Sequence, residues 1–265
     1  MMNINLHQIR FFVAHFFTAK RKGHGVHSPF AYRLCEEVFY NQHTFSVFGE
    51  LNGIRKQLLE NTTLLQIEDH GAGSKTMAGK NRRVCDIAAA GISTTRQSEL
   101  LFRLCNFLNC STVIELGTAL GLNALYLSAV STNLRVISIE GSEQLARFAQ
   151  QLAINNKRQN LEIIHGLFDE KLSEIIQNTG PSFLLYIDGN HTREATLRYF
   201  EMAVTKAGLD AVIVFDDIYW SPGMTEAWKN IRKHPRVKMS LDLFHSGIIF
   251  FRDEIREPVH LKLFV

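Results

Sequence analysis

The chain has 265 residues, of which 46% are hydrophobic and 21% are charged. These values are typical of one large globular domain with an extension, and they exclude disordered, collagen-like and coiled-coil proteins. The net charge of +3, from 29 Lys and Arg against 26 Asp and Glu, is too small to favour nucleic acid as a partner. The four cysteines form no C-x-x-C pair, so neither a zinc ribbon nor a disulfide framework is expected, and a reducing cytoplasm fits best.

The N-terminal part of the chain carries the basic excess, with 11 Lys and Arg against 7 Asp and Glu over residues 1–95. Residues 64–93 are less regular and are interpreted as a linking or lid segment. We expect a helical extension over residues 1–93, without a secretion signal or transmembrane segment, that could mediate a homodimer or another surface contact. Apolar spacing and the helix-start pair Ser28-Pro29 predict its helices at 4–19, from 28 to about 40, and near 46–60.

The pattern of the sequence changes at Thr94, because Thr94 and Gln97 have the spacing of a capping box at a helix start. Short β-branched runs then alternate with helical patterns, as in βαβ units around a parallel sheet. The predicted strands are 112–116, 135–139, 161–165, 182–188 and 211–216, and the predicted helices are 94–108, 121–130, 142–155, 170–178, 193–206 and 222–233.

Two further strands are predicted at 237–242 and 247–251. Only about four residues separate them, which is too few for a parallel crossover, so they are expected to form an antiparallel hairpin. The sequence therefore predicts an α/β domain over residues 94–265, with a doubly wound, seven-stranded sheet and a reversed strand in its C-terminal hairpin.

The strongest local motif is an E-x-G-x-x-x-G run from Glu115 to Gly121, where a strand, a glycine turn and a helix start follow one another. Glycines at such a turn let the backbone approach a ligand closely. Ala119 stands where a dinucleotide fingerprint needs its second glycine, so a pyrophosphate fits poorly. Glu140 ends the next strand, where its carboxylate can accept hydrogen bonds from both ribose hydroxyls of a nucleoside. The combination favours an adenosine-containing cofactor over a turn without a ligand.

Residues 94–252 resemble the class I S-adenosylmethionine (SAM)-dependent methyltransferases in this glycine motif, in Glu140 and in the terminal hairpin. The sheet of these enzymes is Rossmann-like. The resemblance implies that the glycine turn faces the methionine end of the cofactor, Glu140 the ribose and the segment 165–168 the adenine. A pocket containing carboxylates suits the cationic amino and sulfonium groups of SAM. The implied cofactor-binding residues are Glu115, Gly117, Thr118, Gly121, Asn123, Glu140, Gly141, Gly166 and Asp188.

Acidic residues also end the fourth and fifth predicted strands, at Asp188 and at Asp216-Asp217. Parallel strands bring their carboxyl ends to the ligand-binding edge of a sheet, and three carboxylates there would suit Mg²⁺ or another divalent cation. This arrangement is similar to the metal-dependent catechol and caffeoyl-CoA O-methyltransferases, although Asp217 stands where that branch has asparagine. A second interpretation stays open, in which Asp188 contacts the cofactor, Asp216 or Asp217 caps a helix and no metal binds.

His191 lies three residues after Asp188, where the catechol enzymes have a lysine base. A neutral imidazole near pH 7 can take the proton of a hydroxyl as that hydroxyl attacks a methyl carbon. We therefore expect His191 and Asp188 to be the catalytic residues.

The leading hypothesis is a cytoplasmic SAM-dependent O-methyltransferase that acts on a small molecule. The five prolines are isolated, so an N-P-P-Y-like motif of base-amino methylation is absent and nucleic acid is not expected as the acceptor. Two alternatives remain open. One is a metal-independent N-methyltransferase, and the other is a non-catalytic cofactor-binding scaffold whose N-terminal helix docks on a partner or a membrane.

Overall fold

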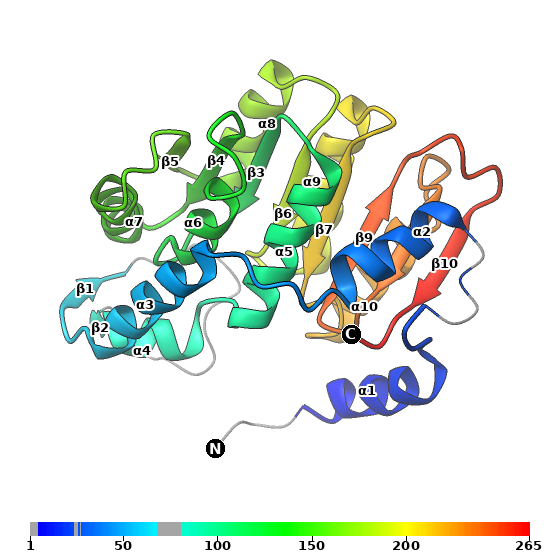
Figure 1. Ribbon diagram of the computed structural model, residues 1–265, viewed down its shortest axis with the longest axis horizontal. Coiled ribbons are helices and arrows are strands. Elements are labelled where there is room, and N and C mark those ends of the chain that lie inside the picture. Colours follow the sequence, from blue (N-terminus) through cyan, green and yellow to red (C-terminus); the bar gives the residue numbers. More distant parts are fainter. Residues whose placement is uncertain (1–4, 24–25, 27, 68–80) are drawn as a thin grey trace. The chain divides into compact units, whose positions relative to one another are not determined.

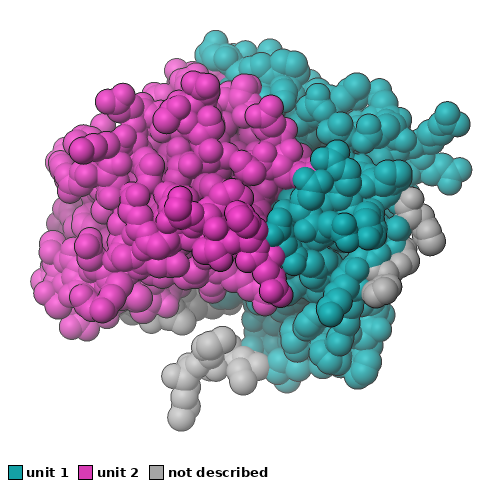
Figure 2. All heavy atoms as spheres, in the orientation of Figure 1, with its two compact units in different colours: residues 1–41, 176–265 teal, residues 42–175 magenta. Residues whose placement is uncertain are grey.

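The computed structural model describes residues 5–23, 26, 28–67 and 81–265, and the chain divides into two compact units. The first unit contains residues 1–41 and 176–265, and the second contains residues 42–175 (Figure 2). The unit boundaries lie at 41/42 and 175/176. They do not test the division into an extension over 1–93 and a domain over 94–265, which stays a prediction.

The second unit contains three parallel strands in the order β3-β4-β5. Their apolar and β-branched residues form the predicted pattern, and the intervening helices are the crossovers that parallel pairing requires. The five predicted elements between 112 and 165 are confirmed with shifts of one or two residues at their ends. The bounds are β3 Thr112–Leu116, α6 Leu122–Ser128, β4 Arg135–Glu140, α7 Glu143–Asn155 and β5 Leu161–His165.

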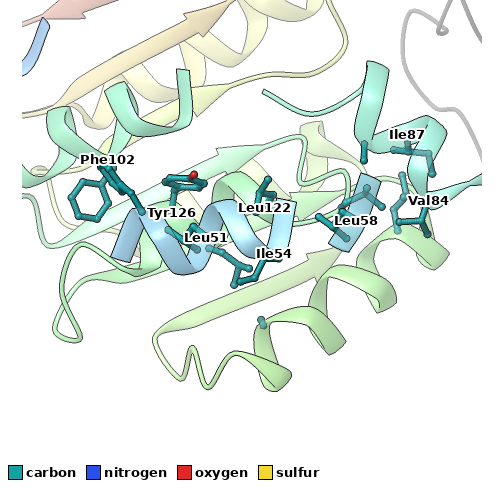
Figure 3. Close-up of a cluster of buried hydrophobic side chains, with 14 of the residues drawn as sticks. Leu51, Ile54, Leu58, Val84, Ile87, Phe102, Leu122 and Tyr126 are labelled. Atoms are coloured by element: carbon teal, nitrogen blue, oxygen red, sulfur yellow. The ribbon is translucent and has the colours of Figure 1, made fainter. Parts of the chain in front are cut away.

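Three helices precede this sheet, namely α3 Val47–Glu60, α4 Val84–Ala90 and α5 Thr95–Leu108. The capping box at the start of α5 is confirmed, since the Gln97 amide donates to the Thr94 hydroxyl and the Gln97 side chain accepts from the Thr94 amide. The helices contribute to one hydrophobic cluster with α6 (Figure 3). Its labelled members are Leu51, Ile54, Leu58, Val84, Ile87, Phe102, Leu122 and Tyr126.

The expectation of irregular structure over 64–93 was wrong for the part that the structure describes. β1 Leu64–Gln66 pairs antiparallel with β2 Asn81–Arg83, and α4 follows at once. The three-residue strands are too short to show an alternating pattern, so no periodic signal marks them in the sequence. Residues 68–80 lie outside the described residues, and the lid interpretation of this segment stays a prediction.

The first unit contains five strands among its described residues, in the order β10-β8-β9-β7-β6. β6 and β7 are parallel, whereas β9 is antiparallel to both β7 and β8, so the predicted reversed strand is confirmed. β10 pairs parallel to β8 and was not predicted. Together with the three strands of the other unit, these five strands make eight among the described residues, in a mostly parallel, Rossmann-like α/β fold. This is one strand more than the seven that the sequence predicts. The bounds are β6 Leu184–Ile187, β7 Val212–Asp216, β8 Met239–Asp242, β9 Ser246–Phe250 and β10 Val259–Lys262.

The helices α8 Phe168–Asn178, α9 Arg193–Lys206 and α10 Pro222–Ile231 match the predicted ranges closely. Two N-terminal helices, α1 Leu6–Thr18 and α2 Pro29–Leu34, belong to the first unit, and α2 continues into a π-helix over Cys35–Phe39.

The segment after α1 runs beside the C-terminal end of the chain (Figure 1). The Lys20 amide donates to the Lys262 carbonyl, and the Phe264 amide donates to the Lys20 carbonyl. In the part of the chain that the structure describes, none of the helices has the length and apolar character needed to cross a bilayer.

The buried face of α3 provides a test of whether the helices before the sheet are part of the folded unit. We expect Leu51→Ala to lower the free energy of unfolding by about 2–5 kcal/mol, because Leu51 is fully buried in the cluster of Figure 3. Leu59→Ala on the same helix is the matched control, since Leu59 is 45% exposed. Urea denaturation followed by far-UV circular dichroism measures both changes. Equal, small effects of the two substitutions would contradict the expectation.

Candidate functional site

The turn between β3 and α6 has a backbone that side chains tolerate poorly. Gly117 has φ +101°, and Gly121 has φ +85°. A Cβ added at Gly121 would lie 2.8 Å from the Cβ of Ala149 on α7, which real Cβ atoms do not approach. Ala119 itself has φ +48°, in the left-handed region. Glycine is therefore needed at Gly121 both for its conformation and for the close approach of α7.

The Glu115 carboxylate is a fully buried hub beneath this turn. The Asn123 side-chain amide donates to Glu115 Oε1 at 2.7 Å, and the Ser138 hydroxyl donates to Oε2 at 2.5 Å. The Thr118 and Ser138 hydroxyls lie 2.6 Å apart. Ser138 was missed by sequence reasoning, although a serine within the apolar strand Arg135–Glu140 was a usable signal. These contacts join β3, the turn, α6 and β4, and the role of Glu115 as a cofactor ligand stays a prediction.

Glu140 ends β4 and faces the turn. Its Oε2 accepts a hydrogen bond from the Ala119 amide and its Oε1 accepts one from the Ser142 amide, both at 2.9 Å. Burial raises the pKa of Glu140, while backbone N–H groups from Ser142, Ala119 and Gly141 oppose that increase. These backbone N–H groups hold the carboxylate in place beside the turn.

The segment after β5 lies beside Glu140, as the predicted arrangement requires. The Gly166 amide donates to the Glu140 carbonyl at 3.0 Å. The His165 ring nitrogen Nε2 lies 3.1 Å from the Gly141 carbonyl oxygen. The second unit thus contains every predicted cofactor residue except Asp188, and it places the glycine turn, Glu140 and Gly166 around the carboxyl end of β4.

The first unit contains a separate acidic cluster at the ends of β6 and β7. Asp188 follows β6 and Asp216 ends β7, and the parallel pairing of these strands brings the two residues together. The Tyr186 hydroxyl donates to Asp188 Oδ2 at 3.1 Å. Burial raises the pKa of Asp188. The pKa of Asp216 is raised well above its usual value, by burial first and then by the negative charges of Asp188 and Asp217.

His191 lies at the edge of this cluster, with its Nε2 3.6 Å from Asp188 Oδ1. The ring centroids of His191 and Trp220 are 6.5 Å apart. Asp217 has φ +53°, and burial raises its pKa, whereas the nearby His191 and His245 lower it. His245 was not expected near the site, because it follows β8 and no motif marks it. The structure therefore brings the predicted catalytic pair together and adds a second histidine to the cluster.

The chemistry of this cluster suits a hard cation, but its arrangement does not identify a metal centre. Carboxylate oxygens are the ligands that Mg²⁺ prefers. Within the described ranges, however, no group of three or more His, Cys, Asp or Glu residues could hold a metal ion. Asp188, Asp216 and Asp217 as metal ligands therefore stay a prediction, and no step of the chemistry is derived through a metal.

Comparison with known proteins agrees with the architecture. A family model described as a methyltransferase domain matches residues 114–218, from within β3 to just after β7. No curated protein matches the chain.

Several solved structures share the fold. An O-methyltransferase from Bacillus cereus in complex with SAH is 18% identical, and the match covers 83% of this chain and 94% of that chain with a TM-score of 0.52. TomG from Streptomyces achromogenes, an O-methyltransferase of tomaymycin synthesis in complex with SAM, is 16% identical, with coverages of 62% and 82% and a TM-score of 0.53.

A protein from Staphylococcus aureus, provisionally assigned as a caffeoyl-CoA O-methyltransferase, is 17% identical, with coverages of 63% and 88% and a TM-score of 0.55. These low identities show the fold. The chain has the class I SAM-dependent methyltransferase fold, resembling O-methyltransferases, and its residues 114–218 match the methyltransferase-domain model.

The raised pKa of Asp216 predicts a specific pH dependence of stability. A carboxyl group whose pKa is raised by folding favours the folded state below its unfolded pKa of about 3.9, and this contribution is lost as pH rises through the folded pKa. Asp216→Asn imitates the protonated form, so we expect this variant to unfold at higher urea concentration than the wild type at pH 7. The difference should shrink toward pH 4.

Urea denaturation across this pH range measures the effect. Asp253→Asn is the control, because Asp253 is exposed and its charge is not part of the cluster. A wild type as stable as Asp216→Asn at pH 7 would contradict the expectation.

Proposed function

We propose that the chain is a SAM-dependent methyltransferase that transfers the methyl group to an oxygen atom of a small molecule. The observation that carries the proposal is the position of Glu140. Its carboxylate is fixed by backbone amides beside the glycine turn, at a strand end where a carboxylate can accept hydrogen bonds from ribose hydroxyls. The family match over residues 114–218 supports the same cofactor.

The residues around the turn fit SAM. Residues 117–121 carry no charged side chain, so no cation there opposes the positively charged amino and sulfonium groups. Gly117 leaves the turn backbone without a side chain where the methionine end would lie. Gly121 instead permits the close approach of α7, and a Cβ at Gly166, in the segment proposed for the adenine, would meet the Lys171 side chain. Thr118 and Asn123 act through Glu115 by holding the turn. When bound, the cofactor supplies a methyl group on a positively charged sulfur.

We assign the proton chemistry to His191 and Asp188. His191 Nε2 faces the Asp188 carboxylate, so Nδ1 is the atom left to accept the proton of an acceptor hydroxyl. The negative charge of Asp188 then stabilises the imidazolium that forms. The main requirement of the transfer is a hydroxyl aligned with the methyl group, and the histidine makes that oxygen more nucleophilic.

Two further points belong to this proposal. A cytoplasmic location agrees with the four cysteines, among which the described structure has no disulfide. A divalent cation at Asp188, Asp216 and Asp217 would position the acceptor oxygens, and loss of turnover in EDTA with recovery in Mg²⁺ is its test.

Two outcomes would replace the proposal. A labelled product that is an amine would indicate transfer to nitrogen, and cofactor binding without turnover would indicate a non-catalytic scaffold.

The role of Glu140 predicts the effect of one substitution. Glu140→Gln replaces one charged acceptor oxygen by an amide, so we expect the affinity for S-adenosylhomocysteine to fall about 10- to 100-fold. Isothermal titration calorimetry measures the change. Glu143→Gln, three residues later in the first turn of α7, is the matched control and should bind like the wild type. Undiminished binding by a folded Glu140→Gln variant would remove Glu140 from the site.

The assignment of His191 is tested by turnover. We expect His191→Gln to lower the rate of methyl transfer by about 10²- to 10⁴-fold while leaving the affinity for S-adenosylhomocysteine unchanged, because a base acts on the acceptor. The assay follows label from methyl-labelled SAM into small molecules of a cell extract, and mass spectrometry of the product identifies the acceptor atom. His43→Gln, at an exposed position, is the control. A full rate in His191→Gln would overturn the assignment.

A further inference from the structure

Helix α1 packs on the rest of the first unit through its more polar side. His15 is buried, with Nε2 3.1 Å from the Leu263 carbonyl oxygen and Nδ1 3.3 Å from Asp242 Oδ1. Burial acts to raise the pKa of Asp242, but contacts with His15, Tyr219 and a backbone amide outweigh it and lower the pKa. His7 Nε2 lies 2.8 Å from the Thr225 hydroxyl, and the ring of Phe11 stacks on Tyr219. Two imidazoles and the Phe11 ring therefore hold the inner side of the helix, and Phe12 and Phe16 add edge contacts with Phe244 and Phe264 at its border.

The outer side of α1 is apolar and exposed. At about 100° per residue, its apolar side chains cover an arc of about 140° on the helix surface. Phe17 is 79% exposed and Leu6 is 82% exposed. The arc comprises Leu6, Ile9, Phe12, Val13, Phe16 and Phe17. Burying the more polar side and exposing the apolar side reverses the usual arrangement of an amphipathic helix on a globular protein.

Only basic charges flank this apolar arc. No Asp or Glu occurs before Glu36, whereas Arg10 lies on the helix and Lys20, Arg21 and Lys22 follow its end. The Arg21 guanidinium lies 4.7 Å from the centre of the Phe16 ring, so positive charge stands directly beside the exposed rings. Aromatic and aliphatic side chains bordered by cations are typical of helices that lie in the interface of an anionic membrane.

We propose that α1 docks the protein on an anionic lipid surface, with its apolar arc inserted at the level of the headgroups and the basic residues paired with lipid phosphates and carboxylates. A second copy of the chain fits less well, because two such helices would bring like charges together and α1 has no acidic residue to pair with them. The helix has 13 residues, which is too short to cross a bilayer. The contacts of His15 and His7 keep α1 attached to the unit, so docking brings the folded chain to the lipid.

The test is co-sedimentation of the full chain with vesicles. We expect binding to phosphatidylcholine vesicles that contain about one third phosphatidylserine, weak binding to pure phosphatidylcholine, and loss of binding in high salt. Val13→Ser with Phe17→Ser should weaken binding at least about tenfold, because both exposed side chains would leave the apolar arc. Ile154→Ser with Leu209→Ser removes two exposed apolar side chains elsewhere and should bind like the wild type.

A second pair of variants tests the charges. Arg10→Gln with Lys22→Gln should lower the affinity for the anionic vesicles and reduce the salt dependence of that affinity. The control is Lys56→Gln with Lys233→Gln, which changes the net charge by the same amount at exposed positions outside α1. The control should have a smaller effect on vesicle binding.

Three results would overturn the proposal. The first is a wild-type protein that stays in solution with anionic vesicles. The second is an equal loss of vesicle binding in the α1 variants and in their controls. The third is a wild-type dimer in size-exclusion chromatography that binds no vesicles and that Val13→Ser with Phe17→Ser converts to a monomer. The last result would assign the apolar arc to a second copy of the chain.

Discussion

The buried carboxylate of Glu115 is the constraint on which the candidate cofactor site depends. A charge removed from water costs several kcal/mol unless hydrogen-bond donors replace the water. Asn123 and Ser138 supply these donors, from the first turn of α6 and from β4. The satisfied carboxylate therefore fixes where α6 begins relative to β3 and β4. The turn at Gly117 and the position of Glu140 depend on that arrangement.

Glu140 shows how such a scaffold prepares a binding group. Its carboxylate accepts hydrogen bonds from the amides of Ala119 and Ser142 before any ligand arrives. The side chain needs little reorientation on binding, so less conformational entropy is lost when a ribose hydroxyl is bound. In the other unit, burial likewise raises the pKa of Asp188 and of Asp216, and the neighbouring charges of Asp188 and Asp217 raise the pKa of Asp216 further. Glu140 is positioned by backbone donors, whereas Asp216 lies among other carboxylates.

Periodic segments and local motifs could be predicted from the sequence. Apolar runs and helical periods located the strands from β3 to β9 and their helices, and the spacing of Thr94 and Gln97 located the start of α5. The hairpin β1-β2 and the strand β10 were missed because segments of three or four residues are too short to establish a period, even where apolar and polar residues alternate as in β10. The network below the turn was predicted only in part. Ser138 joins that network, and His245 joins the acidic cluster of the other unit, through tertiary contacts that no local motif encodes.

Helix α1 shows a further limit of periodicity. Its apolar spacing predicted a helix correctly, but the same spacing suggests that the apolar side faces the core. The side that packs is decided by specific partners instead, since Asp242, the Leu263 carbonyl and Thr225 each bind an imidazole that would otherwise be exposed. Those partners lie more than 200 residues away in the chain, so no window of sequence contains both sides of the contact. Once they fix the helix, Phe11 packs on Tyr219, whereas Phe12, Phe16 and Phe17 are left partly or largely exposed, and Arg21 lies over the Phe16 ring.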